Sequence, residues 1–281
     1  MARVRVVTDS ASALPEQYVQ RYDIDVVPLS IRFGDEEFID GVDLTPDAFW
    51  AKCKVSKTLP ETSAPSAGAF QAAYERAKAK GYDGVIALTL SSMLSASNQA
   101  AVLAAEAVKG EIDVRVIDTL NVSMGQGLIA IEVAEFAATG AGLDELVARS
   151  QSVMAKAGVV AAIDTLEHLI KGGRIGGAKA LLGQVLSIKP LVELKDGVVA
   201  EAGRQRTRAK ALTAVANVAK SHAPLRRLAL IHGACTPADV ATLELLIKDV
   251  PAEFPLIVTD IGPVVGTHGG PGIIGFTWIS E

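Results

Sequence analysis

Three groups of hydroxyl-bearing residues in the first half of the chain follow or connect apolar segments. They are Thr8-Asp-Ser10, Thr62-Ser-Ala-Pro-Ser66 and Leu90-Ser-Ser-Met-Leu-Ser-Ala-Ser97. Any one of these hydroxyls could simply cap a helix N-terminus. Together with the exposed N–H groups of helix N-termini, several of them make a site for an anion. Because neither of the last two groups contains arginine or lysine, we expect neutral donors to hold a carboxylate there.

A glycine- and proline-rich segment near the end of the chain carries His268. Its sequence is Ile261-Gly-Pro-Val-Val-Gly-Thr-His-Gly-Gly-Pro-Gly272. This density of glycine and proline predicts a defined loop rather than a regular helix. Such a loop lets backbone approach a ligand and holds the imidazole in place. His268 is therefore a candidate site residue, with a purely structural histidine as the alternative.

A third group of residues is basic and lies in the second half of the chain. It comprises Lys171-Gly-Gly-Arg-Ile-Gly-Gly177, Lys179, Lys189, Arg204, Arg206, Arg208 and Lys210. The whole chain has 27 basic and 32 acidic residues and a net charge of −5, which argues against a nucleic-acid binder. A basic patch on an acidic protein can dock an acidic partner or a nucleotide-bearing enzyme. A solvated basic face is the alternative.

Motifs for catalysis, metals and cofactors are missing or incomplete. Gly125–Ala130 matches a dinucleotide fingerprint, but it does not begin at the end of the predicted strand 114–118. The sequence has no G-x-S-x-G nucleophile elbow, and its four histidines show no metal-ligand spacing. We therefore expect no catalytic residue, no metal and no cofactor.

Sequence features also predict where the protein resides. Met1–Ser10 lacks the apolar region of a signal peptide, and no stretch approaches the ~18 apolar residues of a membrane span. Cys53 and Cys235 are far apart and predict a reduced pair. We expect a cytoplasmic protein without stable membrane insertion.

The elements that must position the hydroxyl groups alternate between strand and helix. Strand patterns occupy residues 3–7, 24–33, 84–90 and 114–118, and helical patterns occupy 15–22, 46–54, 67–80, 99–108 and 125–138. This alternation predicts a parallel, doubly wound α/β sheet with helices on both faces. Ligands bind such sheets beyond the carboxyl ends of the strands, where several of the hydroxyl groups are expected.

A second pattern follows a predicted connecting helix at 143–156. Strands are predicted at 158–163, 191–194, 198–201, 228–231, 256–258 and 273–279, and helices at 178–186, 208–221 and 237–248. Lys195-Asp-Gly197 is a hairpin turn signal, so this part should contain a mixed sheet. For 281 residues we expect two α/β domains, 1–150 and 151–281, with a boundary near residue 150.

Taken together, these segments resemble the DegV family of bacterial fatty-acid-binding proteins. The likeness is carried, in the family's order, by Val7–Pro15, Asp40–Asp43, Thr62–Ser66, Ser91–Ser95, Lys171–Ile175 and Gly262–His268. The resemblance implies a two-domain DegV-like fold with a long-chain fatty acid in a buried slot. It implies a non-catalytic protein that presents the carboxylate to an ATP-dependent fatty-acid kinase, which makes the acyl phosphate.

The resemblance also assigns roles to individual residues. The ligand-binding residues that it implies are Thr62, Ser63, Ser92, Ser95, Gly266, Thr267 and His268. Thr62 and Ser95 would hydrogen-bond the carboxylate, and His268 would complete the polar network. Arg174 and Arg206 match family positions that would face the kinase or its phosphates.

The sequence departs from the family pattern close to the implied headgroup. Ala96, Ser97 and Asn98 stand where the family commonly has glycine, threonine and tyrosine, and Ala64 stands where glutamine is common. These changes can alter headgroup geometry or acyl preference.

The residues alone also allow two other functions. A hydrolase or transferase could use Ser95 with His268, but it would need an orienting acid and an oxyanion hole that the sequence does not fix. The other is a lipid-responsive sensor that controls a partner protein without acyl transfer.

Overall fold

The computed structural model describes residues 2–181 and 188–281. Its first sheet is parallel, in the order β2 (Asp25–Val27), β1 (Val4–Asp9), β6 (Gly84–Thr89) and β7 (Asp113–Asp118). β1 and β6 are buried along their whole length, as near-continuous apolar runs predict for strands covered on both faces.

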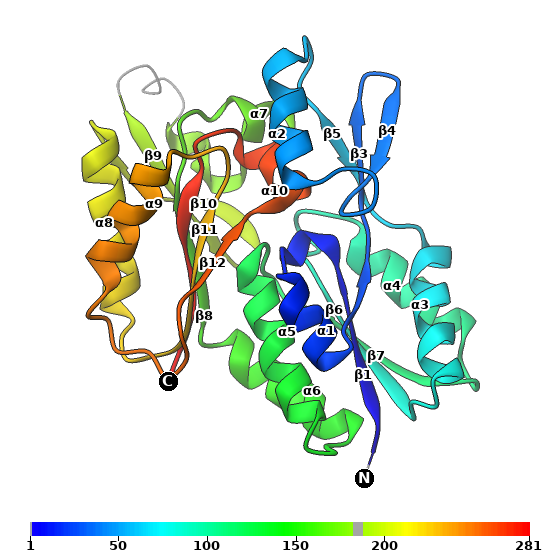
Figure 1. Ribbon diagram of the computed structural model, residues 1–281. Helices are drawn as coiled ribbons and strands as arrows, with labels where there is room; N and C mark the ends of the chain where they lie inside the picture. The colour runs from blue at the N-terminus through cyan, green and yellow to red at the C-terminus, as the bar shows by residue number, and fades with distance from the viewer. Residues whose placement is uncertain (1, 182–187) are drawn as a thin grey trace.

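Helices cover both faces of this parallel sheet (Figure 1). α3 (Ala67–Ala79) and α4 (Ser97–Ala107) pack on one face, and α5 (Met124–Ala137) and α6 (Leu143–Met154) pack on the other. A short 3-10 turn, η1 (Ser10–Ser12), follows β1, and α1 (Glu16–Tyr22) rests on α5. The predicted doubly wound α/β arrangement is confirmed.

A small antiparallel sheet stands beside the parallel one and was not predicted. Its order is β4 (Glu36–Ile39), β3 (Ser30–Phe33) and β5 (Glu61–Ser63), and α2 (Pro46–Val55) connects β4 to β5. The prediction of one strand at 24–33 was wrong, because Pro28 and Leu29 separate β2 from β3. Proline has no N–H for a strand ladder, so the chain leaves the parallel sheet there and enters the small one.

The six-stranded sheet of the second half is mixed, as predicted. Its order is β10 (Val198–Gln205), β9 (Lys189–Lys195), β8 (Ala157–Ala162), β13 (Ile274–Ser280), β11 (Leu225–His232) and β12 (Ile257–Asp260). β11 and β12 pair in parallel, and the other neighbours pair antiparallel. The hairpin predicted at Lys195-Asp-Gly197 joins β9 to β10.

Helices also pack on both faces of the six-stranded sheet. α8 (Arg208–Ser221) and α9 (Pro237–Ile247) cover one face, and α5 contacts the other. Between β8 and β9 lie α7 (Glu167–Lys171) and a 3-10 segment, η2 (Gly176–Leu181). The helix predicted at 178–186 starts as η2, and its remaining part falls on residues 182–187, outside the described residues.

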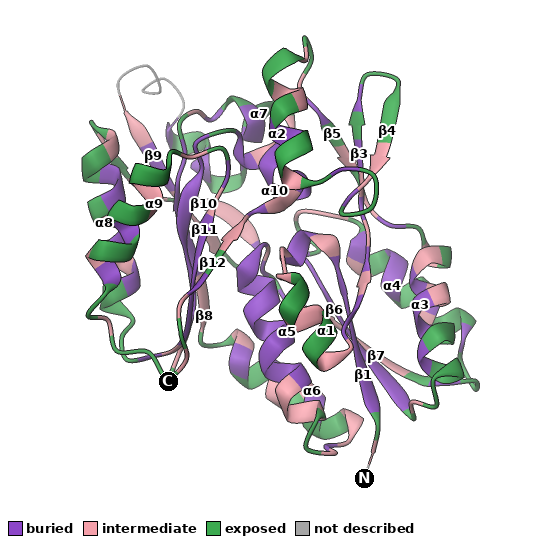
Figure 2. Ribbon diagram, viewed as in Figure 1, coloured by how far each residue is buried: buried purple, intermediate pink, exposed green. Residues whose placement is uncertain are grey.

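α5 is the shared wall between the two larger sheets. Figure 2 shows it buried along most of its length, and it contacts β1 on one side and β13 on the other. Its one buried acid, Glu132, is 1% exposed. Arg149, Arg226 and Arg227 donate hydrogen bonds to that carboxylate. These bonds connect α5 to α6 and to β11.

The segment around His268 forms a helix, α10 (Gly262–Gly269), so the predicted loop was wrong. Pro263 stands in the first turn, where its missing N–H costs no helical hydrogen bond. Gly266 lets the helix pack directly on α2, and Gly270 ends it with φ 75°. Tertiary packing has overridden the low helix propensity of these glycines.

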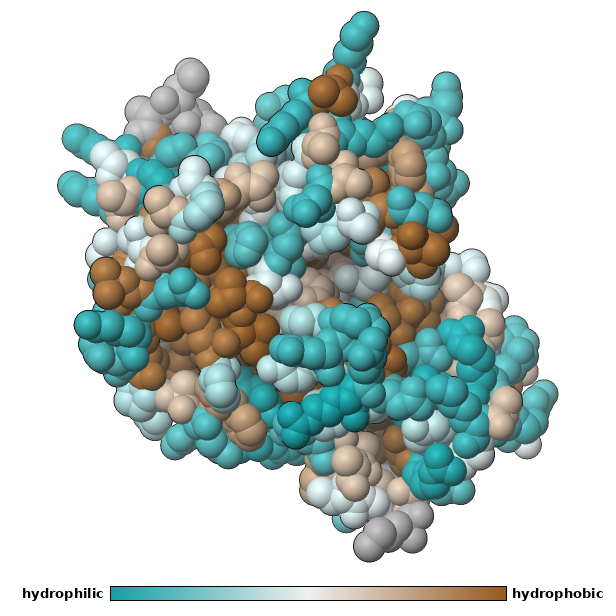
Figure 3. Space-filling model, viewed as in Figure 1, coloured by the Kyte–Doolittle hydropathy of each residue, from teal (hydrophilic) through white to brown (hydrophobic). Residues whose placement is uncertain are grey.

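The surface is mixed in character. Figure 3 shows hydrophilic groups over most of the visible face and apolar groups gathered around α9 and β12, where Leu245 and Val258 are 65% and 40% exposed. No helix in the described ranges combines the length and apolar character needed to cross a membrane.

Candidate ligand-binding site

An apolar cavity of about 230 Å³ lies between the six-stranded sheet and the loops that follow β5, β6 and β7. Val159 and Ala161 on β8 face it, while Val160 and Ala162 belong to the core under α8. The two-residue period of a strand therefore gives β8 one cavity face and one core face. Most other wall residues are aliphatic: Leu29, Leu90, Leu94, Val122, Ile163, Leu169, Val192, Leu194, Val199, Ile231, Val264, Val265 and Ile273.

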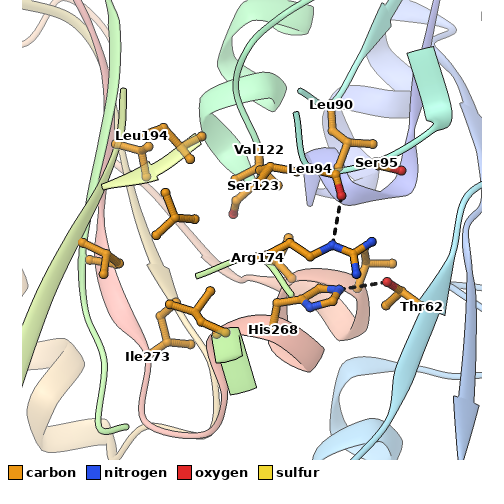
Figure 4. Close-up of a pocket in the computed structure, with 18 of the residues that line it drawn as sticks. Thr62, Leu90, Leu94, Ser95, Val122, Ser123, Arg174, Leu194, His268 and Ile273 are labelled. Carbon is orange, nitrogen blue, oxygen red and sulfur yellow. Dashed lines mark hydrogen bonds between the residues drawn. The ribbon is translucent and has the colours of Figure 1, made fainter. Parts of the chain in front are cut away.

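Thr62 and His268 form a polar pair at one end of this cavity (Figure 4). Thr62 Oγ1, on β5, is 2.8 Å from His268 Nε2, on α10. Burial lowers the pKa of His268 to about 4, and the positive charge of Arg174 acts in the same direction. The imidazole is therefore neutral at neutral pH. Its Nδ1 has no hydrogen-bond partner within the described ranges.

Ser95 lies in the cavity wall and is oriented by its own loop. Its Oγ accepts a hydrogen bond from Ser97 N at 3.2 Å and lies 2.9 Å from Ser97 Oγ. Asn98 Nδ2 donates to Thr89 Oγ1 at 3.0 Å, which ties the loop back to β6. Two of the positions that depart from the family pattern therefore support the loop that carries Ser95.

Arg174 also lies in the cavity wall. Its Nε donates to the carbonyl oxygen of Leu94 at 3.1 Å, so the guanidinium is held beside the Ser95 loop. The chain before it passes very close to the imidazole. A Cβ added to Gly172 would be 2.3 Å from His268 Nδ1, so only glycine fits at that position.

A second, polar hollow adjoins the cavity through shared side chains. Thr62, Arg174 and His268 line both spaces. The hollow is otherwise lined by Leu59, Pro60, Glu61, His168, Lys171, Gly172 and Thr267. The same three polar residues thus separate an apolar space from a charged one.

Other predicted site residues lie outside the apolar cavity wall. These are Ser63, Ser92, Gly266, Thr267 and Arg206. Ser63, Ser92 and Arg206 are exposed. Gly266 is buried against α2, and Thr267 Oγ1 donates to the Pro263 carbonyl at 2.9 Å. The structure thus brings Thr62, Ser95 and His268 to one cavity and leaves these five outside its wall.

The pairing that a hydrolase would need is not formed in this structure. His268 Nε2 is bonded to Thr62, and Ser95 Oγ is bonded to Ser97. In the described parts of the chain, no group of three or more histidine, cysteine or acidic residues is arranged to hold a metal.

Residue assignment from the sequence missed two wall residues that carry polar groups toward the cavity. Arg174 was assigned to a partner surface, and its Lys-Gly-Gly-Arg context gave no sign of a wall position. Ser123 was not assigned to the ligand site, and nothing local to the sequence marks its contact with the cavity.

Comparisons with known proteins show the family and the fold. The sequence model of a family described as "Uncharacterised protein, DegV family" matches residues 3–281. A DegV domain-containing protein of Streptomyces coelicolor is 34% identical over 97% of this chain and 96% of its own length. Among solved structures, a fatty-acid-binding DegV family protein of Thermus thermophilus is 33% identical, with a TM-score of 0.91, over 99% of this chain and 100% of that one. DegV of Bacillus subtilis, described as a fatty acid binding protein, is 29% identical with a TM-score of 0.89 over the full length of both chains.

Proposed function

The chain belongs to the DegV family, and on that premise we propose that it binds a long-chain fatty acid. The carboxylate would sit at Thr62 and Ser95, and the hydrocarbon would fill the apolar cavity. The observation that carries this proposal is the meeting of an aliphatic cavity with the Thr62–His268 pair at one end. Each buried methylene contributes ~0.8 kcal/mol, so a long chain supplies ample affinity before the cost of ordering it.

The hydrogen bonds of the site suit a carboxylate. With its single proton on Nε2, the neutral imidazole donates to Thr62 Oγ1 and leaves the Thr62 hydroxyl proton for the ligand. Ser95 Oγ accepts a hydrogen bond from Ser97 N, and its own proton is available to the ligand when Ser97 Oγ is the donor of the 2.9 Å bond between the two hydroxyls. Two neutral hydroxyl donors then face one acid group, with Arg174 near enough to add positive potential.

The test is the lipid content of the protein. Native mass spectrometry of protein purified from cells, followed by lipid extraction, should show one fatty acid per chain. A chain that carries no fatty acid, and takes up none after delipidation, would contradict the proposal.

We further propose that the protein presents the bound acid to an ATP-dependent fatty-acid kinase in the cytoplasm. This proposal is supported by the polar hollow, which shares Thr62, Arg174 and His268 with the apolar cavity and is also lined by Lys171 and Glu61. A phosphoryl donor arriving there would meet the positive charges of Arg174 and of Lys171, which is ion-paired with Glu167. Arg206 is exposed and would contact the kinase.

A reconstituted reaction tests this step. A fatty-acid kinase from the same organism, ATP and the loaded protein should yield an acyl phosphate that hydroxylamine traps as the hydroxamate. Arg206→Ala should lower that yield while retaining the bound fatty acid. An undiminished yield would remove Arg206 from the kinase contact.

A further inference from the structure

Ser123 places an unpaired hydroxyl in the wall of the apolar cavity. The residue is 1% exposed and lines the cavity, and its Oγ has no hydrogen-bond partner in the described residues. Figure 4 shows its oxygen pointing into the space between the aliphatic side chains, on the opposite side of Leu94 from Ser95. This hydroxyl is therefore separate from the Thr62 and Ser95 hydroxyls at the acid end.

The position of Ser123 makes its lack of a partner unusual. It precedes α5 as the N-cap residue, where a serine side chain normally accepts a bond from the first turn, yet it makes no such bond. Its backbone has φ 55° and ψ −149°, a conformation that is strained for any residue other than glycine. Ser123 N donates to the Ala11 carbonyl at 2.9 Å, and Gly127 N donates to the Ser123 carbonyl at 3.0 Å. These bonds hold the strained backbone in place while the side chain is left for the cavity.

A plain hydrocarbon chain would bury this hydroxyl without satisfying it. Buried polar groups in proteins are nearly always hydrogen-bonded, and an orphan is destabilising. The residues near it on the wall, such as Leu90, Leu94 and Val122, offer only apolar side chains. A ligand that carries a polar group along its chain can supply the missing partner.

We propose that the preferred ligand is a hydroxy fatty acid whose chain oxygen pairs with Ser123 Oγ. This rests on the proposed fatty-acid binding and narrows its substrate class. A chain hydroxyl can both donate and accept, so it matches serine in either direction. A carbon–carbon double bond offers only a weak π acceptor, so an unsaturated acid is the less favoured occupant.

Competition binding to the delipidated protein tests the proposal. The probes are stearic acid, oleic acid and the 9-, 10- and 12-hydroxystearic acids, each measured with the native protein, Ser123→Ala and Ser95→Ala. One hydroxystearic isomer should bind the native protein on the order of tenfold more tightly than stearic acid. In Ser123→Ala this ratio should fall to about one. In Ser95→Ala every acid should weaken by a similar factor, with the ratio retained.

The other outcomes are decisive as well. The inference is overturned if stearic acid equals or exceeds every hydroxystearic isomer, or if the preference survives in Ser123→Ala. A preference for oleic acid that disappears in Ser123→Ala would also overturn the inference, because the partner of Ser123 Oγ would then be the double bond of an unsaturated acid. Failure of every acid to bind would instead defeat the proposed function. If Ser123→Ala does not fold, Ser123→Gly removes the same hydroxyl and suits the positive φ.

Discussion

Trp50 packs so closely on Gly266 that this position of α10 has no room for a side chain. A Cβ added there would be 2.8 Å from Trp50 Cη2 and 2.9 Å from Phe49 Cε1. The indole is itself fixed, because its Nε1 donates to Asp260 Oδ2 at 3.0 Å. This contact between α2 and α10 sets the position of the helix that carries His268.

Gly266→Ala should therefore damage both stability and binding. The added methyl forces α10 away from Trp50, at a cost of about 1–3 kcal/mol in the free energy of unfolding. The displaced His268 should weaken fatty-acid binding several-fold. Urea unfolding and a binding titration measure the two effects.

Gly68→Ala is the matched control, since Gly68 is an exposed glycine in α3. The nearest atom to its added Cβ is Ser66 Oγ at 3.8 Å, so alanine should stabilise the helix by up to ~1 kcal/mol. If Gly266→Ala were as stable as Gly68→Ala, the tight contact with Trp50 would not constrain α10.

Thr62→Val removes one hydroxyl donor with little change of shape. Since a hydrogen bond to a charged group contributes ~1.5–3 kcal/mol, the affinity for a long-chain acid should fall about 10- to 100-fold. Isothermal titration with the delipidated protein measures the loss. Thr58→Val changes an exposed threonine outside the cavity and should bind as the native protein does. Equal affinities for the two variants would exclude Thr62 from the headgroup site.

Ala161→Leu should shorten the acid that the cavity accepts. Ala161 lies on the cavity face of β8 and is 4% exposed, so the larger side chain has only the cavity to occupy. Long acids should lose affinity relative to short ones, by ~0.8 kcal/mol for each methylene excluded. The affinities of the native protein and of Ala161→Leu for saturated acids of about 10 to 18 carbons measure this loss. Urea unfolding should show that the two proteins are about equally stable. A uniform loss at every chain length would show that Ala161 does not limit the hydrocarbon.

Glu132→Gln should be among the most destabilising polar substitutions in the protein. Burial acts to raise the pKa of Glu132, but hydrogen bonds from Arg226 and Arg227 hold it below the usual value. Removing the charge leaves Arg227, which is 3% exposed, with the carboxylate of Glu135 as its one ion-pair partner among the described residues. The expected loss is ~3–5 kcal/mol in the free energy of unfolding, measured with urea.

The exposed pair of Glu106 and Lys109 provides the control for that substitution. Their nitrogen and oxygen are 3.3 Å apart, and both side chains are largely exposed. Glu106→Gln should change stability by less than ~0.5 kcal/mol. Similar effects from the two substitutions would mean that the Glu132 network contributes little.

The depressed pKa of His268 predicts a pH dependence of stability. Its pKa is about 4 in the folded protein, against 6.5 as the ordinary value. Between these values the unfolded chain binds the proton and the folded protein does not, so the free energy of unfolding falls as pH drops from about 7 toward 4. The full contribution is ~3 kcal/mol.

Comparing the native protein with His268→Asn isolates this contribution. Burial raises the pKa of Asp9 to about 7, which gives the opposite slope, with stability lost as pH rises toward 7. That slope is present in both proteins and cancels in the difference. Urea unfolding at pH 5 and pH 7 should show less acid destabilisation in His268→Asn. Equal acid destabilisation would mean that His268 keeps its ordinary pKa when folded.

The sequence by itself determined most of the local structure and the family. Short runs rich in valine and isoleucine located β1, β6 and β7, and Lys195-Asp-Gly197 located the β9–β10 hairpin. These features depend on residues a few positions apart, because strand period and turn geometry are local properties of the chain. The order of the short motifs was enough to indicate the DegV family.

Only the tertiary structure decided how the site is assembled. Thr62 and His268 are 206 positions apart, and their contact depends on the packing of β5 and α10. That packing also made a helix of a glycine-rich segment that favours a loop when considered alone. Ser123 looks like an ordinary helix cap in the sequence, but a long-range backbone bond to Ala11 holds it at positive φ, and its hydroxyl points into the cavity. For Thr62, His268 and Ser123, contacts between distant segments decide where the side chain points.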